Sequence, residues 1–194
     1  MQINQSETII ILGDSPFIET IQNKVSYLLD RYFSIGINRV VESFNTSYHI
    51  FIDIGLIPIT NRHPAIPTIS LYKYGDLIQK ERKELLEIYS FNIKKNTKED
   101  ILKDGKLAYC GFTHDFAISY CISKGWKNIV LVGAADFIQG DHFTSKEQFS
   151  PSELLIEKSK RFIENICTKK ANIFTINPHS LLNVPYMDIN SLLT

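Results

Sequence analysis

The sequence Thr-Ile-Ile-Ile-Leu-Gly-Asp-Ser-Pro, residues 8–16, decides the fold of this chain. Its first five residues are β-branched or apolar, which predicts a strand buried on both faces, as in a parallel sheet. Gly13 permits a sharp turn, and Ser15 followed by Pro16 is typical of an N-cap and a first helical residue. Such a turn leaves backbone N–H groups free to bind an anion. We therefore expect a ligand site at Gly13–Ser15, the alternative being a plain strand-to-helix turn.

The composition indicates one globular domain over residues 1–194, with 44% hydrophobic and 22% charged residues. The 21 basic and 21 acidic residues cancel, so no strong attraction to nucleic acid or an anionic membrane is expected. Three cysteines without metal-ligand spacing favour a reducing compartment. The apolar run near the N-terminus is too short to span a bilayer. These features predict a cytoplasmic protein.

Strand and helix patterns alternate along the chain, with no internal repeat. Strands are expected at residues 8–12, Tyr32–Ile37, Tyr48–Ile54, Ile66–Tyr72, Ile129–Val132 and Asn172–Ile176. Helices are expected after Pro16, over Asp76–Tyr89, from a Thr113 cap to about Lys124, and after the capping box Ser150-Pro151-Ser152-Glu153. Gly55–Pro67 and Phe91–Lys106 are expected to be loops. The alternation predicts an α/β fold, a three-layer αβα sandwich with a mostly parallel, Rossmann-like sheet.

Polar residues follow several of the expected strands. They are Gly13–Ser15, Asn38, Asp53, Gly133–Asp136 and Asn177–Ser180. In a parallel sheet, ligands bind outside the carboxyl ends of the strands, close to the point where the strand order reverses. We therefore expect these residues to form one site.

The run Tyr109–Phe137, YCGFTHDFAISYCISKGWKNIVLVGAADF, resembles a pattern in two related bacterial families. These are the CMP-sialic-acid-dependent sialyltransferases and the motility accessory factors. The run has their capped helix, Gly-aromatic-Lys element, Ile-rich strand and Gly-x-Asp-Phe-like ending. Three shorter elements are similar to the families' first turn, second-strand asparagine and Pro-Asn-Ser-Leu-Leu ending: Ile11–Pro16, Gly36–Asn38 and Asn177–Leu182.

The resemblance implies a nucleotide-binding glycosyltransferase-like domain whose ligand is a nucleotide-sugar donor, with a CMP-linked sugar as the candidate. It implies that Asp14 and Ser15 lie by the nucleotide phosphates and ribose, and that Asn38 and Asp53 stand near the donor. It also places Thr113 at a helix N-terminus that faces the nucleotide. Ser15 replaces a glycine of the families, Asp14 and Asp53 replace amides, and the chain has no room for the sialyltransferase lid.

The catalytic histidine of the sialyltransferases precedes the helix that is expected here at Pro151, where this chain has Phe149. His142, beside Asp141, matches the accessory-factor pattern better and could act as general base, or could be an exposed loop residue.

Three further residues have open roles. His114 could contact phosphate or only decorate a first helical turn. Asp136 could bind ribose or a metal, or close the turn after its strand. Ser180 is also expected at the site, because it lies in the Asn177–Leu182 element that is similar to the families' Pro-Asn-Ser-Leu-Leu ending. No paired-cysteine or His-x-x-x-His metal signal is present, so no metal is expected.

Two other functions stay open. Leu12-Gly13-Asp14-Ser15 also matches the opening block of GDSL-type esterases, with Ser15 as nucleophile, although the chain lacks their Asp-x-x-His near the C-terminus. The missing family histidine also permits a non-catalytic nucleotide-binding or assembly protein. The expected partner is a small nucleotide or nucleotide sugar, and a second copy of the chain is a further candidate.

Overall fold

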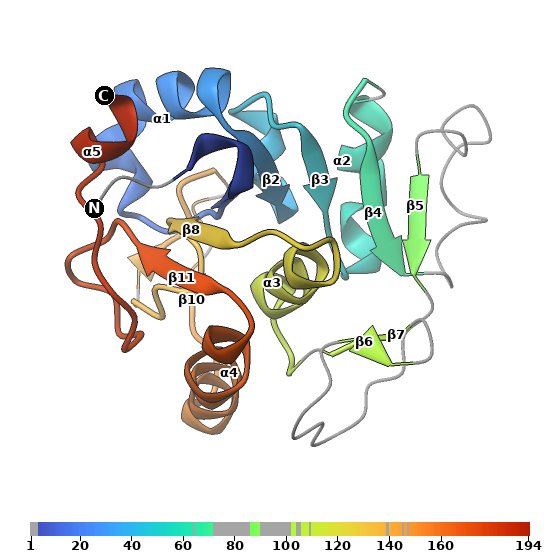
Figure 1. Cartoon of the computed structure of the whole chain (residues 1–194). Coiled ribbons are helices and arrows are strands. Elements are labelled where there is room, and N and C mark those ends of the chain that lie inside the picture. The colour runs from blue at the N-terminus through green and yellow to red at the C-terminus, as the bar shows by residue number, and fades with distance from the viewer. Residues whose placement is uncertain are drawn as a thin grey trace.

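A parallel sheet forms the centre of the molecule. The computed structural model describes residues 4–63, 65–71, 86–89, 102–103, 106–108, 110–138, 140–144, 146 and 148–194. Seven strands form the sheet, and each neighbouring pair is parallel (Figure 1). In spatial order they are β11 (Asn172–Thr175), β8 (Asn128–Val132), β1 (Thr8–Leu12), β2 (Phe33–Ile37), β3 (Tyr48–Ile50), β4 (Thr68–Leu71) and β5 (Leu86–Tyr89). The predicted α/β fold with a Rossmann-like sheet is confirmed.

The strand order reverses beside β1. The chain first runs outward from β1 through β2, β3 and β4 to β5, and then returns to place β8 on the other side of β1. β1 and β8 are therefore interior strands, as the sequence predicted. Because the two directions diverge between these strands, their carboxyl ends leave room for a ligand.

Helices cover both faces of the sheet (Figure 1). One face carries α1 (Ile18–Arg31), α2 (Ile57–Arg62) and α5 (Asn190–Leu193), and the other carries α3 (Thr113–Ser123) and α4 (Glu153–Asn165). Side chains of β1 alternate between the two cores: Ile10 and Leu12 join the first, and Ile9 and Ile11 join the second. All four side chains are fully buried, which agrees with the prediction that this strand is covered on both faces.

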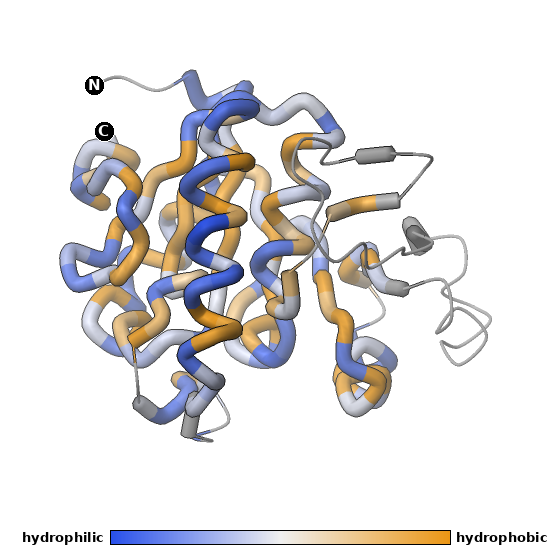
Figure 2. Tube along the Cα trace, turned by 90° about the horizontal axis from the view of Figure 1, so that it is seen from below, coloured by the Kyte–Doolittle hydropathy of each residue, from blue (hydrophilic) through white to orange (hydrophobic). Residues whose placement is uncertain are grey.

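Figure 2 shows the same division by hydropathy, with apolar strands inside and helices that carry both apolar and polar residues. In the described parts of the chain, short 3-10 helices lie at Gln5–Glu7, Asn38–Glu42, Ile54–Leu56 and Cys167–Lys169. The same parts contain two small antiparallel pairs outside the main sheet: β6 (Leu102–Lys103) with β7 (Lys106–Leu107), and β9 (Gly140–Asp141) with β10 (Gln148–Phe149). Within the described residues, no helix has the length and apolar character needed to cross a membrane.

Some local expectations were wrong. The end of the expected helix Asp76–Tyr89 is strand β5, which pairs with β4, and the rest of that range up to residue 85 lies outside the described residues. Pairing with a neighbouring strand overrides the helical spacing of its apolar residues. The expected loop Gly55–Pro67 contains α2, which accepts Pro58 in its first turn, where no N–H partner is required.

The helix starts also differ by one or two residues from those expected. α1 begins at Ile18 instead of Pro16, and α4 has Ser152 rather than Ser150 as its N-cap. α3 begins at Thr113 itself, with Phe112 as the N-cap residue. The Thr113 hydroxyl is therefore free of the capping role and bonds elsewhere.

Candidate functional site

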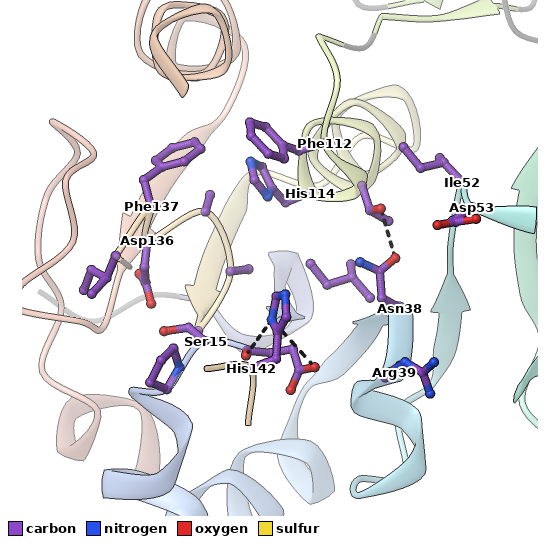
Figure 3. A pocket seen from close by; sticks show the side chains of 18 of the residues that line it. Ser15, Asn38, Arg39, Ile52, Asp53, Phe112, His114, Asp136, Phe137 and His142 are labelled. Atoms are coloured by element: carbon purple, nitrogen blue, oxygen red, sulfur yellow. Dashed lines mark hydrogen bonds and ion pairs between the residues drawn. The ribbon is translucent and has the colours of Figure 1, made fainter. Parts of the chain in front are cut away.

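A pocket of about 410 Å³ opens at the carboxyl ends of β1, β2, β3 and β8, beside the N-terminal end of α3 (Figure 3). Most of the residues expected at the site line it. They are Asp14, Ser15, Asn38, Asp53, Thr113, His114, Asp136 and His142. Gly13 and Ser180 are not among the residues that line the pocket. The switch point of the sheet thus brings together residues from five separate parts of the chain.

Gly13 shapes the pocket through close packing. A Cβ atom on Gly13 would lie 2.3 Å from the carbonyl oxygen of Gly133, in the turn after β8. The N–H of Gly13 donates to the carbonyl of Val132 at 2.9 Å, and that of Ser15 donates to Gly133 at 3.1 Å. These two N–H groups join the turns after β1 and β8, so they are not available for the anion that the sequence suggested.

Ser15 stabilises the start of the first helix. Its hydroxyl oxygen accepts a hydrogen bond from the backbone N–H of Phe17 at 3.3 Å, and its carbonyl accepts one from Ile18 at 3.1 Å. This cap agrees with the Ser-Pro pattern, although the regular helix starts later.

Asp14 holds a loop over the pocket. Its carboxylate accepts hydrogen bonds from the backbone N–H of Thr144, at 2.7 Å, and from the Thr144 hydroxyl. Its carbonyl accepts one from the N–H of Phe143 at 3.0 Å. Burial raises the pKa of Asp14, and the Thr144 bonds together with His142 and Lys146 oppose that rise. The carboxylate and the carbonyl of Asp14 therefore accept hydrogen bonds from the loop after β9. Asp14 is for this reason a weaker candidate for binding ribose or phosphate than the resemblance implied.

His142 lies on this loop and extends into the pocket (Figure 3). Its Nδ1 is 3.2 Å from the carbonyl oxygen of Asp14 and 3.9 Å from Oδ2 of the same residue. Because a carbonyl only accepts, Nδ1 carries the proton, and the neutral ring then has its lone pair on Nε2. This tautomer is the one that a general base held through Nδ1 requires.

Asn38 has an unusual backbone and links three elements. It adopts a left-handed conformation with φ of 54° at the end of β2, and its carbonyl lies 2.8 Å from Nε2 of His49. Its side-chain oxygen accepts a hydrogen bond from the Thr113 hydroxyl at 2.9 Å. No described residue accepts from its Nδ2 group, so the amide can donate to a ligand oxygen.

The outer rim is charged and solvated. Asp53 is exposed, and its Oδ1 accepts from the N–H of Gly55 at 2.9 Å. Arg39 contributes the only Lys or Arg side chain among the described residues that line the pocket. It lies 3.5 Å from Glu42, with 37% of its side chain exposed. Arg39 was not among the residues predicted from the sequence, although its position directly after Asn38 at a strand end could have indicated it.

Asp136 is the most deeply buried acid of the pocket, with 3% of its surface exposed. Burial raises its pKa to about 6, against the opposing effects of the nearby Asn177, Ser15 and Ser180 side chains. Neither carboxylate oxygen forms a hydrogen bond of ordinary geometry with the described residues, and the same holds for Nδ2 of Asn177. Since buried acceptors without partners are costly, Asp136 is suited to receive hydrogen bonds from a ligand. The Ser180 side chain, which does not line the pocket, is one of the groups that oppose the rise in the pKa of Asp136.

The turn after β8 is strained. Ala135 and Phe137 have φ values of 56° and 55°, and Gly133 has 61°. A left-handed conformation costs about 1 kcal/mol or more for a residue with a Cβ, and such residues gather at functional sites. Of these three left-handed residues, only Gly133 is of a type whose sequence position suggests such a conformation.

An aromatic wall stands opposite His142. Phe112 and His114 stack with ring centroids 4.9 Å apart and an interplanar angle of 16°. Phe137 meets both rings edge-on, at 5.7 Å and 5.2 Å. All three line the pocket. Phe112 and Phe137 were not predicted at the site, because the contact between them depends on how the α3 and β8 segments pack.

Comparisons with known proteins support the fold. No known family matches the sequence, and no curated protein matches it. Among solved structures, the chain is similar to the MAf glycosyltransferase from Magnetospirillum magneticum AMB-1, with a TM-score of 0.62 and 13% sequence identity. The match covers 98% of this chain but only 35% of that protein. At this identity the likeness establishes a shared fold.

The described residues contain no group of three or more His, Cys, Asp or Glu side chains that could hold a metal ion.

Proposed function

We propose that this chain is a glycosyltransferase-like protein that binds a nucleotide-sugar donor in the pocket at the switch point. One observation carries the proposal: eight residues selected from the sequence line a single pocket. The fold likeness to a protein described as a glycosyltransferase supports the same class. The motility accessory factor resemblance and the CMP-linked donor belong to this proposal, and CMP is the first ligand to test.

In the proposed reaction, a bond forms between an acceptor hydroxyl oxygen and the anomeric carbon of the donor sugar. The bond between that carbon and the phosphate oxygen breaks, and the phosphate leaves with the electron pair. Nε2 of His142 takes the proton of the acceptor hydroxyl. The Asn38 amide and the Arg39 guanidinium stabilise the leaving phosphate, which is the role that fixed donors serve in such transfers.

Asp136 would complete the site by accepting hydrogen bonds from a pair of ligand hydroxyls. Its two buried oxygens, which form no hydrogen bond of ordinary geometry with the described residues, support that role. Burying these oxygens without hydrogen bonds costs free energy in the unliganded protein. A ligand that donates hydrogen bonds to them removes this cost, which adds to the free energy of binding.

Thermal unfolding with CMP, other nucleotides and nucleotide sugars tests the binding step, because a ligand specific for the folded state raises the melting temperature. We expect His142→Ala to cut transfer by roughly a hundredfold, the usual contribution of one acid–base group, with nearly unchanged melting. His142→Gln keeps a polar side chain without proton transfer and should be equally slow. Wild-type turnover in both variants would remove His142 from the reaction, and nucleotide binding without turnover would indicate a binding protein.

The esterase alternative is tested on the same protein. The Ser15 hydroxyl accepts a hydrogen bond from a helix N–H, which is a capping role. We expect Ser15→Ala to weaken nucleotide binding by about 1 kcal/mol and a fluorophosphonate probe to leave the wild type unlabelled. Labelling at Ser15 would instead establish the hydrolytic function.

A further inference from the structure

A buried chain of hydrogen bonds connects α4 to the aromatic wall of the pocket. Ser159, on α4, donates its hydroxyl proton to Oδ1 of Asp115, on α3. Nε2 of His114 lies 3.2 Å from the Ser159 oxygen and 3.6 Å from Oδ1 of Asp115. The other oxygen of Asp115 accepts from the backbone N–H of Phe112 at 3.1 Å. Ser159 and Asp115 are fully buried and lie outside the pocket lining.

These bonds determine which nitrogen of His114 carries its proton. The hydroxyl of Ser159 has one proton, and that proton is given to Asp115. The Ser159 oxygen can therefore only accept from His114, so Nε2 must be the protonated nitrogen. In a neutral imidazole the lone pair then lies on Nδ1. Burial lowers the pKa of His114 to about 3, which keeps the ring neutral at ordinary pH.

Nδ1 is placed to meet a ligand. His114 lines the pocket, and Figure 3 shows its ring on the pocket wall beside Phe112. Nε2 is turned to the buried Ser159, and no described residue bonds to Nδ1. We propose that Ser159 and Asp115 fix His114 so that Nδ1 is a neutral hydrogen-bond acceptor for an N–H or O–H group of the bound ligand.

This inference deepens the proposed function, since it rests on the same pocket and names the chemistry recognised there. A neutral acceptor repels the oxygens of phosphate, so the role of phosphate contact considered for His114 does not fit this tautomer. It suits a donor group instead. Beside the Phe112 ring, that donor is either an amino group of a planar base or a hydroxyl of a sugar. Ser159 acts through His114 and is a positioning residue.

The tautomer is tested first, without ligand. The chain has five histidines, so ¹⁵N spectra of the imidazole rings are simple, and His114→Gln identifies the relevant signals. The spectra are recorded at pH 8.5, where Asp115 is ionised even though burial raises its pKa to about 7. We expect wild-type His114 to show a protonated Nε2 and an unprotonated Nδ1. A protonated Nδ1 would overturn the inference.

Variants then test whether Ser159 determines the tautomer of His114. Ser159→Ala removes the acceptor for Nε2 and should abolish the tautomer preference of His114. Ser119→Ala is the matched control, because Ser119 is a fully buried serine on α3 whose hydroxyl has no partner among the described residues. The control should leave the His114 spectrum unchanged. An unchanged spectrum in Ser159→Ala would show that Ser159 does not position His114.

Binding is tested with CMP as the probe. CMP should shift the Nδ1 signal of the wild type, and Ser159→Ala should weaken CMP binding by about tenfold, the effect of one hydrogen bond. Loss of the shift with UMP, which has a carbonyl in place of the amino group, identifies a base donor. Loss with deoxy-CMP identifies a ribose donor. An Nδ1 signal that CMP leaves unmoved overturns the contact, whereas failure of every nucleotide to stabilise the wild type counts against the proposed function.

Discussion

The two sides of the pocket are built differently. On the β1–β8 side, Gly13 packs on Gly133, Asp136 is buried without ordinary hydrogen bonds, and Phe137 holds a left-handed backbone. On the β2–β3 side, Asp53 and Arg39 are open to water. The β1–β8 side is closely packed and contains buried polar atoms without ordinary hydrogen bonds, whereas the charged residues of the β2–β3 side are solvated.

This difference indicates where specificity resides. A ligand that bonds to a buried, unpartnered group recovers the full cost of that group's desolvation, whereas a charge at the rim exchanges one set of solvent contacts for another. The β1–β8 side should therefore discriminate between ligands, and the β2–β3 side should mainly attract an anion. Substitutions on the first side should have large effects, and those on the second should have small and salt-dependent effects.

The largest effect is expected from Gly13→Ala. The added Cβ would lie 2.3 Å from a backbone oxygen of Gly133 and 2.7 Å from Cα of Ala134, so β1 and β8 must separate at their carboxyl ends. We expect the free energy of unfolding to fall by roughly 2–4 kcal/mol, which urea denaturation would measure. Gly55→Ala is the control on the other side, because its nearest neighbour would be a side-chain oxygen at 3.5 Å. Equal stability of both variants would contradict the comparison.

Asp136→Asn should separate stability from binding. Burial raises the pKa of Asp136 in the folded state from 3.8 to about 6. The contribution of Asp136 to stability is therefore fully present below pH 3.8 and is lost as the pH rises through about 6. We expect the variant to be more stable than the wild type by roughly 1–3 kcal/mol at pH 8, with the difference vanishing near pH 4.

The same variant should bind the nucleotide more weakly, because an amide presents one acceptor where the carboxylate presents two. Chemical denaturation at pH 4, 6 and 8, together with nucleotide titration, would measure both effects. A stability difference that does not change with pH would show that Asp136 is not a buried charge in the folded protein.

Weakening the hydrogen bonds between Asp14 and Thr144, which we call the Asp14 clamp, should have an intermediate effect on stability. Thr144→Val removes the hydroxyl that donates to Asp14 but keeps the size of the side chain and the backbone bond. We expect a loss of about 1 kcal/mol and faster hydrogen exchange in residues 140–144. Thr20→Val is the control, since Thr20 is exposed and its hydroxyl donates to the carbonyl of Phe17, the N-cap residue of the same helix. Unchanged exchange in the loop would show that the clamp does not order it.

Much of the fold was predictable because β1 is a short run of β-branched and apolar residues followed by a glycine turn, which favours a strand covered on both faces. The strand-end residues of the site were predictable for the same reason, since parallel strands present their carboxyl ends at one edge. Asn38 and Asp136 follow from this rule, whereas His142 was predicted from the accessory-factor resemblance and lies after the small strand β9. The helix expected up to Tyr89 was wrong because pairing of β5 with β4 is a long-range interaction that local spacing does not contain.

The remaining site residues depend on packing between distant segments. Phe112 meets Phe137 across the pocket wall, and Ser159 reaches His114 from a helix 45 residues further along the chain. Neither pair follows a sequence pattern of period two or 3.6. The commitment of Asp14 to Thr144 was likewise invisible, because a carboxylate at a strand end has the same sequence signature whether it binds a ligand or a loop.

The smallest effect is expected from Arg39→Ala, on the solvated side. The Arg39 side chain is 37% exposed, and its guanidinium already lies 3.5 Å from the Glu42 carboxylate, so its removal should change the free energy of unfolding by less than about 0.5 kcal/mol. Nucleotide binding should weaken a few-fold at low salt, and this difference should shrink as the salt concentration rises, because water and ions screen an exposed charge. Arg39→Lys keeps the charge and should retain most of the affinity at low salt. Calorimetric titration at two salt concentrations would measure this, and a large, salt-independent loss in Arg39→Ala would mean that Arg39 moves into a buried contact when the ligand binds.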